Sequence, residues 1–255
     1  MNSSMLKGAQ LSGGSRAVEL GLITLKGTKT LANIMFMFGL LTAAGILYIS
    51  YLNTGSTSNS YHSAIIALIG VLIGYFYTAK PIKLSSRYGL GEIAIFLSFG
   101  PLLTLGSGFA ISMETIQLFS NEFYNLMILG VPIGLLTTNI LFINQFPDYT
   151  SDKKVGKNHL VVLFGKKASR WIYAINLALA TGSLYYMAVE NIVNETQDSL
   201  FLYVLIPITI IYSFYLISGL FKYYNNRKLI KYNIHTIYFH MLFSFIYMII
   251  LANFQ

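Results

Sequence analysis

Long apolar stretches separated by short polar segments make up most of the chain. A membrane-spanning helix needs about 20 largely apolar residues, far more than a buried strand of a soluble domain. Seven stretches come close to this length or exceed it. They predict membrane spans over Leu31–Leu52, Ser63–Thr78, Leu90–Ser112, Tyr124–Ile143, Trp171–Val189, Leu200–Phe221 and Thr236–Ala252. The pattern therefore predicts an all-α fold, a polytopic membrane helix bundle of about seven transmembrane helices.

Basic residues occupy only one class of the segments between these spans. All 17 Lys and Arg residues lie before the first span or in the segments that follow the second, fourth and sixth spans. The other segments carry acids such as Glu114, Glu122 and Glu190. Segments rich in Lys and Arg remain in the cytoplasm. We therefore expect a multi-pass protein of the plasma membrane, with its N-terminus cytoplasmic and its C-terminus outside.

The composition agrees with a membrane protein. Hydrophobic residues make up 55% of the chain and charged residues 10%, whereas soluble domains carry about 25% charged residues. Such a hydrophobic chain is not intrinsically disordered. The net charge of +8 follows from the topology and does not indicate nucleic-acid binding. There are no cysteines, which excludes disulfides, thiolate catalysis and cysteine-based zinc sites.

Neither an internal repeat nor a flexible linker divides the chain. We therefore expect a single transmembrane domain over residues 1–255. Within it, residues 1–30 are expected to form a cytoplasmic N-terminal segment, and residues 144–170 a cytoplasmic loop. The first sixteen residues, MNSSMLKGAQLSGGSR, have no apolar core, so we do not expect them to form a signal peptide.

Two acids in the 144–170 segment indicate a metal site. Asp148 and Asp152 are four residues apart, so in a helix both carboxylates lie on one face and repel each other. A divalent cation can compensate, and Mg²⁺ takes one or two protein carboxylates together with waters and substrate phosphates. Lys153, Lys154 and Lys157 follow and could hold a diphosphate. The alternative is that both acids are solvated loop charges with the lysines as their salt-bridge partners.

The segment YTAKPIKLSSRYGLGE joins the second and third predicted spans. Tyr77 closes the second span, and Lys83 is one of the cations that project from the segment. Glu92 is unexpected, because an acid near the start of a span is costly unless it has a partner. Either Glu92 is stabilised by a helix N-terminus, or it holds a neighbouring Lys or Arg in place.

Three segments together resemble the UbiA superfamily of intramembrane prenyltransferases. NQFPDYTSDKKVGKNHLVVLFG is similar to the second aspartate-rich motif of that family. YTAKPIKLSSRYGLGE, followed by FGPLLTLGS, is similar to a family loop and its next helix. LSGGSRAVELGLIT resembles the stretch that follows the first aspartate motif. The three segments occur in the expected order, so the resemblance covers essentially the whole chain.

The resemblance implies transfer of a prenyl group from a polyprenyl diphosphate to an aromatic acceptor. The most similar branch of the family prenylates 1,4-dihydroxy-2-naphthoate in menaquinone biosynthesis. Asp148 and Asp152 are then the expected Mg²⁺ ligands. Lys157 and Lys83 are expected to contact the diphosphate, and Tyr77 to hydrogen-bond it or to face the allylic cation.

Three further residues are substrate-binding candidates by the same resemblance. Arg16 is expected to contact the diphosphate. Asn144 either joins the metal shell or caps the loop. Lys153 is a weaker candidate, because its charge also follows from the topology.

The family pattern has nine helices and two aspartate motifs. Four predicted spans precede Asp148 and three follow it, which corresponds to the last seven helices of that pattern. The first aspartate motif has no counterpart here, so we expect the chain alone to bind Mg²⁺–diphosphate weakly and to turn over slowly or not at all. A non-catalytic or truncated relative is therefore an alternative. A small transporter is another, although the interiors of the spans are almost free of charge.

Overall fold

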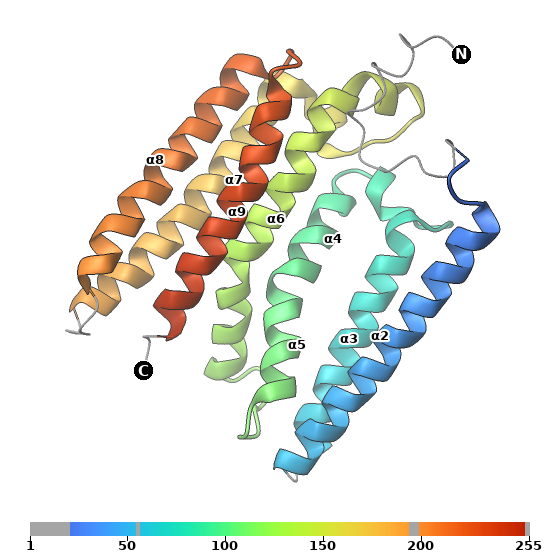
Figure 1. The fold of residues 1–255 in the computed structure, drawn as a ribbon, viewed down its shortest axis with the longest axis vertical. Coiled ribbons are helices and arrows are strands. Elements are labelled where there is room, and N and C mark those ends of the chain that lie inside the picture. The colour runs from blue at the N-terminus through green and yellow to red at the C-terminus, as the bar shows by residue number, and fades with distance from the viewer. Residues whose placement is uncertain (1–20, 55–56, 194–198, 253–255) are drawn as a thin grey trace.

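The computed structural model describes residues 21–54, 57–193 and 199–252, and Figure 1 shows their arrangement. In these ranges the regular structure is helical. The elements in chain order are α2 (Leu25–Thr54), α3 (Thr57–Thr78), the 3₁₀ turn η1 (Leu84–Ser86), α4 (Leu90–Phe99), α5 (Pro101–Ile111), α6 (Asn121–Lys154), α7 (Leu160–Val193), α8 (Ser199–Tyr223) and α9 (Leu229–Ala252). The predicted all-α bundle is confirmed.

Each predicted span lies on one of these helices or, for the third span, on a consecutive pair. Within the described ranges, six helical stretches are long and apolar enough to cross a membrane. The helix α7, which holds the predicted span Trp171–Val189, is not among the six. That span contains Asn176, Thr181 and Ser183, which lower its apolarity. Helix α7 packs on both α6 and α8, so it lies between two other helices of the bundle.

The third predicted span is broken into two helices at Gly100. α4 ends there, and α5 begins at Pro101, a residue that favours the first position of a helix. A Cβ on Gly100 would lie 2.7 Å from the carbonyl oxygen of Gly130, and a Cβ on Gly130 would lie 2.5 Å from the carbonyl group of Gly100. Two glycines are therefore needed where α4 and α5 cross α6 in close contact.

The aspartate motif lies on a helix and not in a loop. We expected residues 144–170 to form a cytoplasmic loop, but α6 continues through Pro147 as far as Lys154. The next helix, α7, already begins at Leu160. The expectation of a loop was therefore wrong for most of this segment. It followed from the polar composition, which does not distinguish a loop from a helix that extends beyond the apolar layer.

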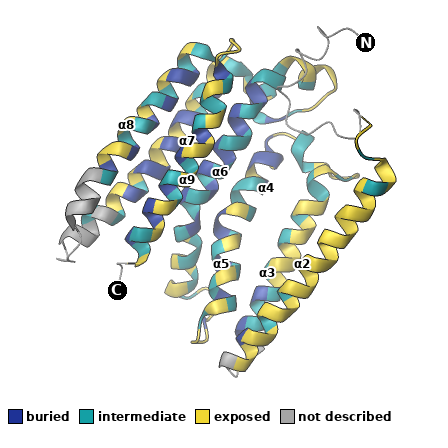
Figure 2. Ribbon diagram, in the orientation of Figure 1, coloured by how far each residue is buried: buried dark blue, intermediate teal, exposed yellow. Residues whose placement is uncertain are grey.

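Helices α6 to α9 pack around one hydrophobic core. Its fully buried side chains include Phe142, Phe146, Tyr173 and Phe239. Helix α6 also contacts α4 and α5, so it connects this core to the remaining helices. Helix α2 packs mainly on α3 and exposes most of its apolar side chains, as Figure 2 shows. A bundle with such an apolar exterior is suited to a lipid environment.

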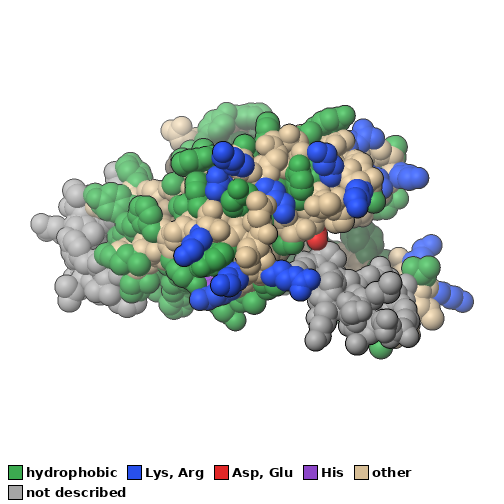
Figure 3. Space-filling model, turned by 90° about the horizontal axis from the view of Figure 1, so that it is seen from above, with side chains coloured by type: hydrophobic (Ala, Val, Ile, Leu, Met, Phe, Trp, Pro, Cys, Tyr) green, Lys and Arg blue, Asp and Glu red, His purple; other side chains and the backbone are tan. Residues whose placement is uncertain are grey.

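The segments that join α3 to α4, α6 to α7 and α8 to α9 all lie at the same end of the bundle (Figure 1). We call this end the basic end. Viewed from that side, Lys and Arg side chains are spread over the surface (Figure 3). The aspartate motif, at the end of α6, also lies here. The fold thus gathers at one end the cations that the sequence distributes over three separate segments.

Candidate functional site

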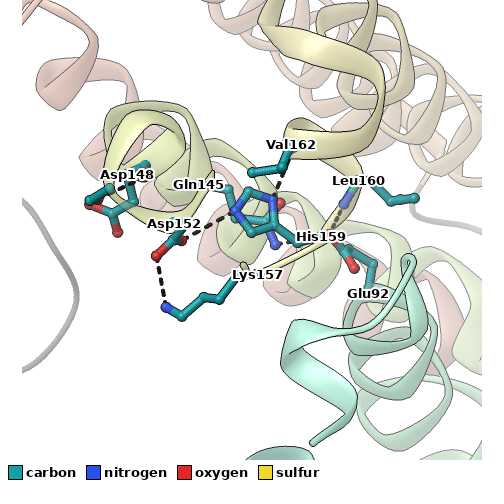
Figure 4. A network of polar contacts seen from close by, with 9 residues as sticks. Glu92, Gln145, Asp148, Asp152, Lys157, His159, Leu160 and Val162 are labelled. Atoms are coloured by element: carbon teal, nitrogen blue, oxygen red, sulfur yellow. Dashed lines mark hydrogen bonds and ion pairs between the residues drawn. The ribbon is translucent and has the colours of Figure 1, made fainter. Parts of the chain in front are cut away.

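Asp148 and Asp152 lie one helical turn apart near the end of α6, on the same face (Figure 4). The two Asp152 oxygens have different partners. Lys157 Nζ donates to Oδ1 over 2.8 Å, and His159 Nε2 lies 3.2 Å from Oδ2. No described residue forms a hydrogen bond or ion pair with the Asp148 carboxylate. One acid of the pair is therefore compensated by described residues, and the other has no such partner among them.

The turn after α6 brings Lys157 back towards Asp152. Val155 ends the helix, and Gly156 follows with a φ of 74°, in the left-handed region that glycine adopts without a steric penalty. The backbone N–H of Lys157 then donates to the Asp152 carbonyl over 3.0 Å. The spacing of aspartate, glycine and lysine in the sequence therefore produces the ion pair directly.

Glu92 connects three helices below the aspartate pair. Its side chain is only 3% exposed, and its Oε1 accepts hydrogen bonds of 2.9 Å from Gln145 Nε2 and from the backbone N–H of Leu160. The sequence alone is compatible with two roles for Glu92, stabilisation by a helix N-terminus or pairing with a Lys or Arg. Glu92 does lie in the first turn of α4, but its partners are an amide side chain and a backbone amide. It joins α4, α6 and α7 (Figure 4).

His159 lies between this network and Asp152 and is only 2% exposed. The backbone N–H of Val162 donates to its Nδ1 over 3.4 Å, which leaves Nε2 as the donor to Asp152. Burial lowers the pKa of the His159 imidazole below its usual value, although the carboxylates of Glu92 and Asp152 act in the opposite direction. The neutral imidazole thus orients one Asp152 oxygen without adding a full charge.

A cavity of about 370 Å³ opens beside the motif at the basic end. Three cationic residues line it: Lys83 and Arg87 from the α3–α4 segment, and Lys157 from the α6–α7 turn. Arg87 is held by a 2.8 Å hydrogen bond from its Nη2 to the Pro81 carbonyl. The two segments are also joined directly, since the Asn158 N–H donates to the Ser86 carbonyl over 3.1 Å. Three positive charges converge here on a space that can hold an anion.

The remaining sequence-predicted residues have different surroundings. Tyr77 is half-buried near the end of α3, whose neighbours include η1 and α4. Asn144 uses its amide inside the bundle, because Nδ2 donates to the Ile140 carbonyl and Oδ1 accepts from Asn233. Lys153 extends over the ring of Tyr149, with Nζ 5.7 Å from the ring centroid. Arg16 lies outside the described residues.

The aspartate motif supplies carboxylate oxygens, which suit Mg²⁺, but too few of them to complete the coordination shell of the ion. Among the described residues, no group of three or more His, Asp or Glu side chains could hold a metal ion. Two carboxylates on one helix face are nevertheless enough for Mg²⁺, which completes its shell with waters and substrate phosphates. The Asp148 carboxylate, which has no partner in the described part of the chain, and the adjacent basic cavity fit such shared binding. Asp148 and Asp152 are the residues that would hold the ion.

Three residues of this site were not identified from the sequence as site residues. Arg87 was recognised only as one of several loop cations, and His159 and Gln145 were assigned no role. Their contacts join positions that are far apart along the chain, such as Gln145 with Glu92. The one local signal was the acid itself, since a carboxylate near a span indicates a nearby partner.

These features together define a polytopic helical membrane protein with a basic cavity beside paired carboxylates at one end. The model of the UbiA prenyltransferase family matches residues 15–247. The chain belongs to this family, and the resemblance stated from its motifs is confirmed.

Named relatives agree with this assignment. The chain is 26% identical over 185 residues to a 1,4-dihydroxy-2-naphthoate octaprenyltransferase of Haemophilus influenzae, covering 72% of the chain and 56% of that protein. It is 32% identical over 169 residues to a 2-carboxy-1,4-naphthoquinone phytyltransferase of Synechocystis sp., covering 64% and 48%. The chain thus spans about half the length of these relatives. No solved structure shows a significant match.

Proposed function

We propose that this protein is a prenyltransferase that moves a polyprenyl group from its diphosphate to an aromatic acceptor in the membrane. The observation that carries the proposal is the convergence of Lys83, Arg87 and Lys157 on one cavity beside Asp148 and Asp152. A diphosphate needs cations and a metal, whereas the isoprenoid tail needs an apolar environment. The basic end of an apolar bundle supplies both.

The chemistry follows from these positions. Negative charge develops on the diphosphate as its bond to the allylic carbon breaks, and preorganised cations stabilise that charge. Lys83, Arg87 and Lys157 are placed to do so. Mg²⁺ held by Asp148 and Asp152 would add Lewis-acid stabilisation of the leaving group. Lys157 exchanges its Asp152 contact for a phosphate oxygen, and the acceptor ring attacks the allylic carbon as the diphosphate leaves. The ring then regains aromaticity by losing the group at the attacked position, which for 1,4-dihydroxy-2-naphthoate is the carboxylate, released as CO₂.

Acceptor and location are also part of the proposal. The names of the relatives support a naphthalene-type acceptor, and 1,4-dihydroxy-2-naphthoate in menaquinone biosynthesis is the one we propose. The positive-inside rule supports a cytoplasmic position for the basic end and hence an orientation in the plasma membrane. The diphosphate would then reach the site from the cytoplasm, and the prenyl tail from the lipid.

The test measures binding of inorganic diphosphate to the purified protein, with and without Mg²⁺, together with prenyl transfer to 1,4-dihydroxy-2-naphthoate. We expect Mg²⁺-dependent binding that Lys157→Ala and Asp148→Asn weaken. The matched control is Lys228→Ala, which removes an exposed lysine from the same end but outside the cavity. Binding that needs no Mg²⁺, or that responds equally to all three substitutions, contradicts the proposal.

A second candidate is a non-catalytic relative that binds diphosphates without turnover. It is favoured by the small number of carboxylates near the motif, since the described residues hold no group of three metal-binding side chains. Mg²⁺-dependent diphosphate binding without prenyl transfer would support this second candidate.

A further inference from the structure

Tyrosine rings line the contact between helices α8 and α9 at the basic end. Tyr223 of α8 stacks on Tyr232 of α9, with the ring centroids 5.7 Å apart and the planes inclined by 23°. Tyr232 also contacts the ring of Tyr215, at a centroid distance of 5.2 Å. A Cβ on Gly219 would overlap the Tyr232 ring, so the missing side chain lets this ring lie against α8. We call Tyr215, Tyr223 and Tyr232 the tyrosine seam.

Three lysines lie over the tyrosine seam. The Nζ atoms of Lys222 and Lys228 lie 5.4 and 5.8 Å from the centroid of the Tyr223 ring, and Nζ of Lys231 lies 5.7 Å from that of Tyr215. These distances allow cation–π attraction. No salt bridge joins any of the three lysines to a described acid. The rings thus gather three exposed positive charges that have no anionic partner in the described ranges.

The seam is separate from the basic cavity. The cavity is lined by residues of the α3–α4 segment and the α6–α7 turn, and none of the three seam lysines is among them. Helix α8 packs mainly on α7 and α9, and it lies at the side of the bundle opposite to α2 (Figure 1). The seam therefore lies at the periphery of the bundle, where the protein meets its surroundings.

Exposed apolar side chains continue from the lysines into the membrane layer. Ile211 is exposed and lies eleven residues before Lys222, so it is on the same face of α8 and about 16 Å deeper. Half of the hydrocarbon core of a bilayer is about 15 Å thick, which is the depth that one acyl chain fills. Lys231 begins a row of exposed side chains on α9 that continues with Ile234, Tyr238, Met241, Phe245 and Met248. Each helix thus offers an apolar surface below a cation.

Neither topology nor the proposed reaction requires this arrangement. The positive-inside rule depends on the number of Lys and Arg residues in a segment, whatever rings they contact. A diphosphate site needs carboxylates for Mg²⁺, and residues 199–252 contain neither Asp nor Glu. A phosphodiester carries a single charge and needs no metal ion. Basic clusters at the cytoplasmic ends of membrane helices attract anionic phospholipids.

We infer that the tyrosine seam binds the phosphodiester headgroup of an anionic phospholipid such as phosphatidylglycerol. Lys222, Lys228 and Lys231 contact the headgroup, and the rings hold the three lysines in place. The acyl chains lie along the exposed apolar faces of α8 and α9. The inference does not depend on the proposed prenyl transfer, since it concerns a surface outside the basic cavity.

A natural reporter lies beside the seam. Trp171 is the one tryptophan of the chain, and its ring lies 4.9 Å from that of Phe221, the residue before Lys222. Brominated lipids quench tryptophan fluorescence only at close range, so Trp171 reports the lipid bound next to α8. The purified protein is reconstituted into mixed bilayers, and quenching by brominated phosphatidylglycerol is compared with quenching by brominated phosphatidylcholine at equal mole fractions.

The variants are Lys222→Gln, Lys228→Gln and Lys231→Gln, singly and together. The matched control is Lys80→Gln, which removes an exposed lysine of the α3–α4 segment that does not line the basic cavity. Tyr223→Leu keeps every charge and removes the ring under two of the lysines, whereas Tyr223→Phe keeps the ring. Thermal unfolding identifies any folding defect of Tyr223→Leu, and the substitutions of exposed lysines test the inference independently of it.

The unsubstituted protein should prefer brominated phosphatidylglycerol. Each lysine substitution at the seam should lower this preference about fivefold, and the triple variant should lose it. Lys80→Gln and Tyr223→Phe should leave it unchanged, and Tyr223→Leu should reduce it. Equal quenching by both lipids in the unsubstituted protein, or an equal loss in Lys80→Gln, overturns the inference. Relief of quenching by inorganic diphosphate with Mg²⁺ also overturns it, because the seam would then be a second diphosphate site.

Discussion

The backbone N–H of Leu160, the first residue of α7, donates a 2.9 Å hydrogen bond to the carboxylate of Glu92 in the first turn of α4. The first N–H groups of a helix have no partner within the helix, so one of them is satisfied here by a buried acid from another helix. The same carboxylate binds Gln145 of α6. One buried side chain thus helps to fix the position of the aspartate motif relative to the α3–α4 segment, together with the Asn158–Ser86 backbone hydrogen bond.

Replacing Glu92 by Ala should destabilise the protein. The substitution leaves the Leu160 N–H and the Gln145 amide without their acceptor, so we expect the free energy of unfolding to fall by about 1–3 kcal/mol. Glu92→Gln keeps one acceptor oxygen and should cost less. Thermal unfolding in nanodiscs measures the effect, with Glu114→Ala as the control, because Glu114 is exposed. Equal stability of Glu92→Ala and the control would show that the Glu92 contacts do not contribute to the stability of the protein.

Removing a cation from the basic cavity should weaken anion binding. Hydrogen bonds to charged groups contribute about 1.5–3 kcal/mol, so Lys83→Ala, Arg87→Ala and Lys157→Ala should each reduce diphosphate affinity about tenfold or more. Calorimetric titration with inorganic diphosphate measures this change. Lys228→Ala serves as the control for net charge. If all four variants lose affinity alike, the general positive potential of this end, and not the cavity, binds the anion.

Chelation of Mg²⁺ should abolish diphosphate binding, and Asp148→Asn should reproduce that effect at saturating Mg²⁺. Among the described residues Asp148 is the carboxylate of the pair without a partner, so we expect its charge to be the one available to the ion. Loss of a metal ligand should lower affinity by at least about tenfold. The isosteric Glu122→Gln, in the first turn of α6 at the opposite end of that helix, is the control. Metal-independent binding by Asp148→Asn at the affinity of the unsubstituted protein contradicts the assignment.

The contact between Gly100 and Gly130 should not tolerate a methyl group. A Cβ on Gly130 meets the Gly100 carbonyl at 2.5 Å, so Gly130→Ala should force α5 and α6 apart and cost about 1–3 kcal/mol. Gly39→Ala in α2 is the matched control, because a Cβ there meets nothing within 4 Å. Thermal unfolding compares the two. A Gly130→Ala variant as stable as Gly39→Ala would mean that the helices approach less closely.

The orientation in the membrane can be tested by labelling introduced cysteines, without background labelling of native thiols, because the chain has no cysteine. Lys228→Cys places a thiol at the basic end, and Met113→Cys places one in the exposed segment between α5 and α6 at the other end. If the basic end is cytoplasmic, an impermeant maleimide should label position 113 in intact cells and position 228 only after the membrane is opened. The reverse labelling would invert the proposed topology.

The helices and the aspartate pair could be predicted from the sequence because both depend on local order. Apolar stretches identify the spans, and a four-residue interval places Asp148 and Asp152 on one face. The break at Gly100 has a local signal in the following Pro101, but the close approach of Gly130 from another helix could not be predicted. The Glu92–Leu160 contact and the Asn144–Asn233 pair likewise join distant parts of the chain. Hydrophobic periodicity carries no information on such partners.

The three cations around the basic cavity have a consequence for the energetics of the whole protein. Lys83, Arg87 and Lys157 repel one another while the cavity holds no anion, so the empty protein stores unfavourable electrostatic energy. A bound anion relieves it, and ligand binding should therefore raise the melting temperature in a concentration-dependent way. Neutralising Lys83, which forms no ion pair with a described residue, should make the empty protein more stable even as it weakens binding. The three cations thus lower the stability of the protein without a ligand and favour the binding of an anion.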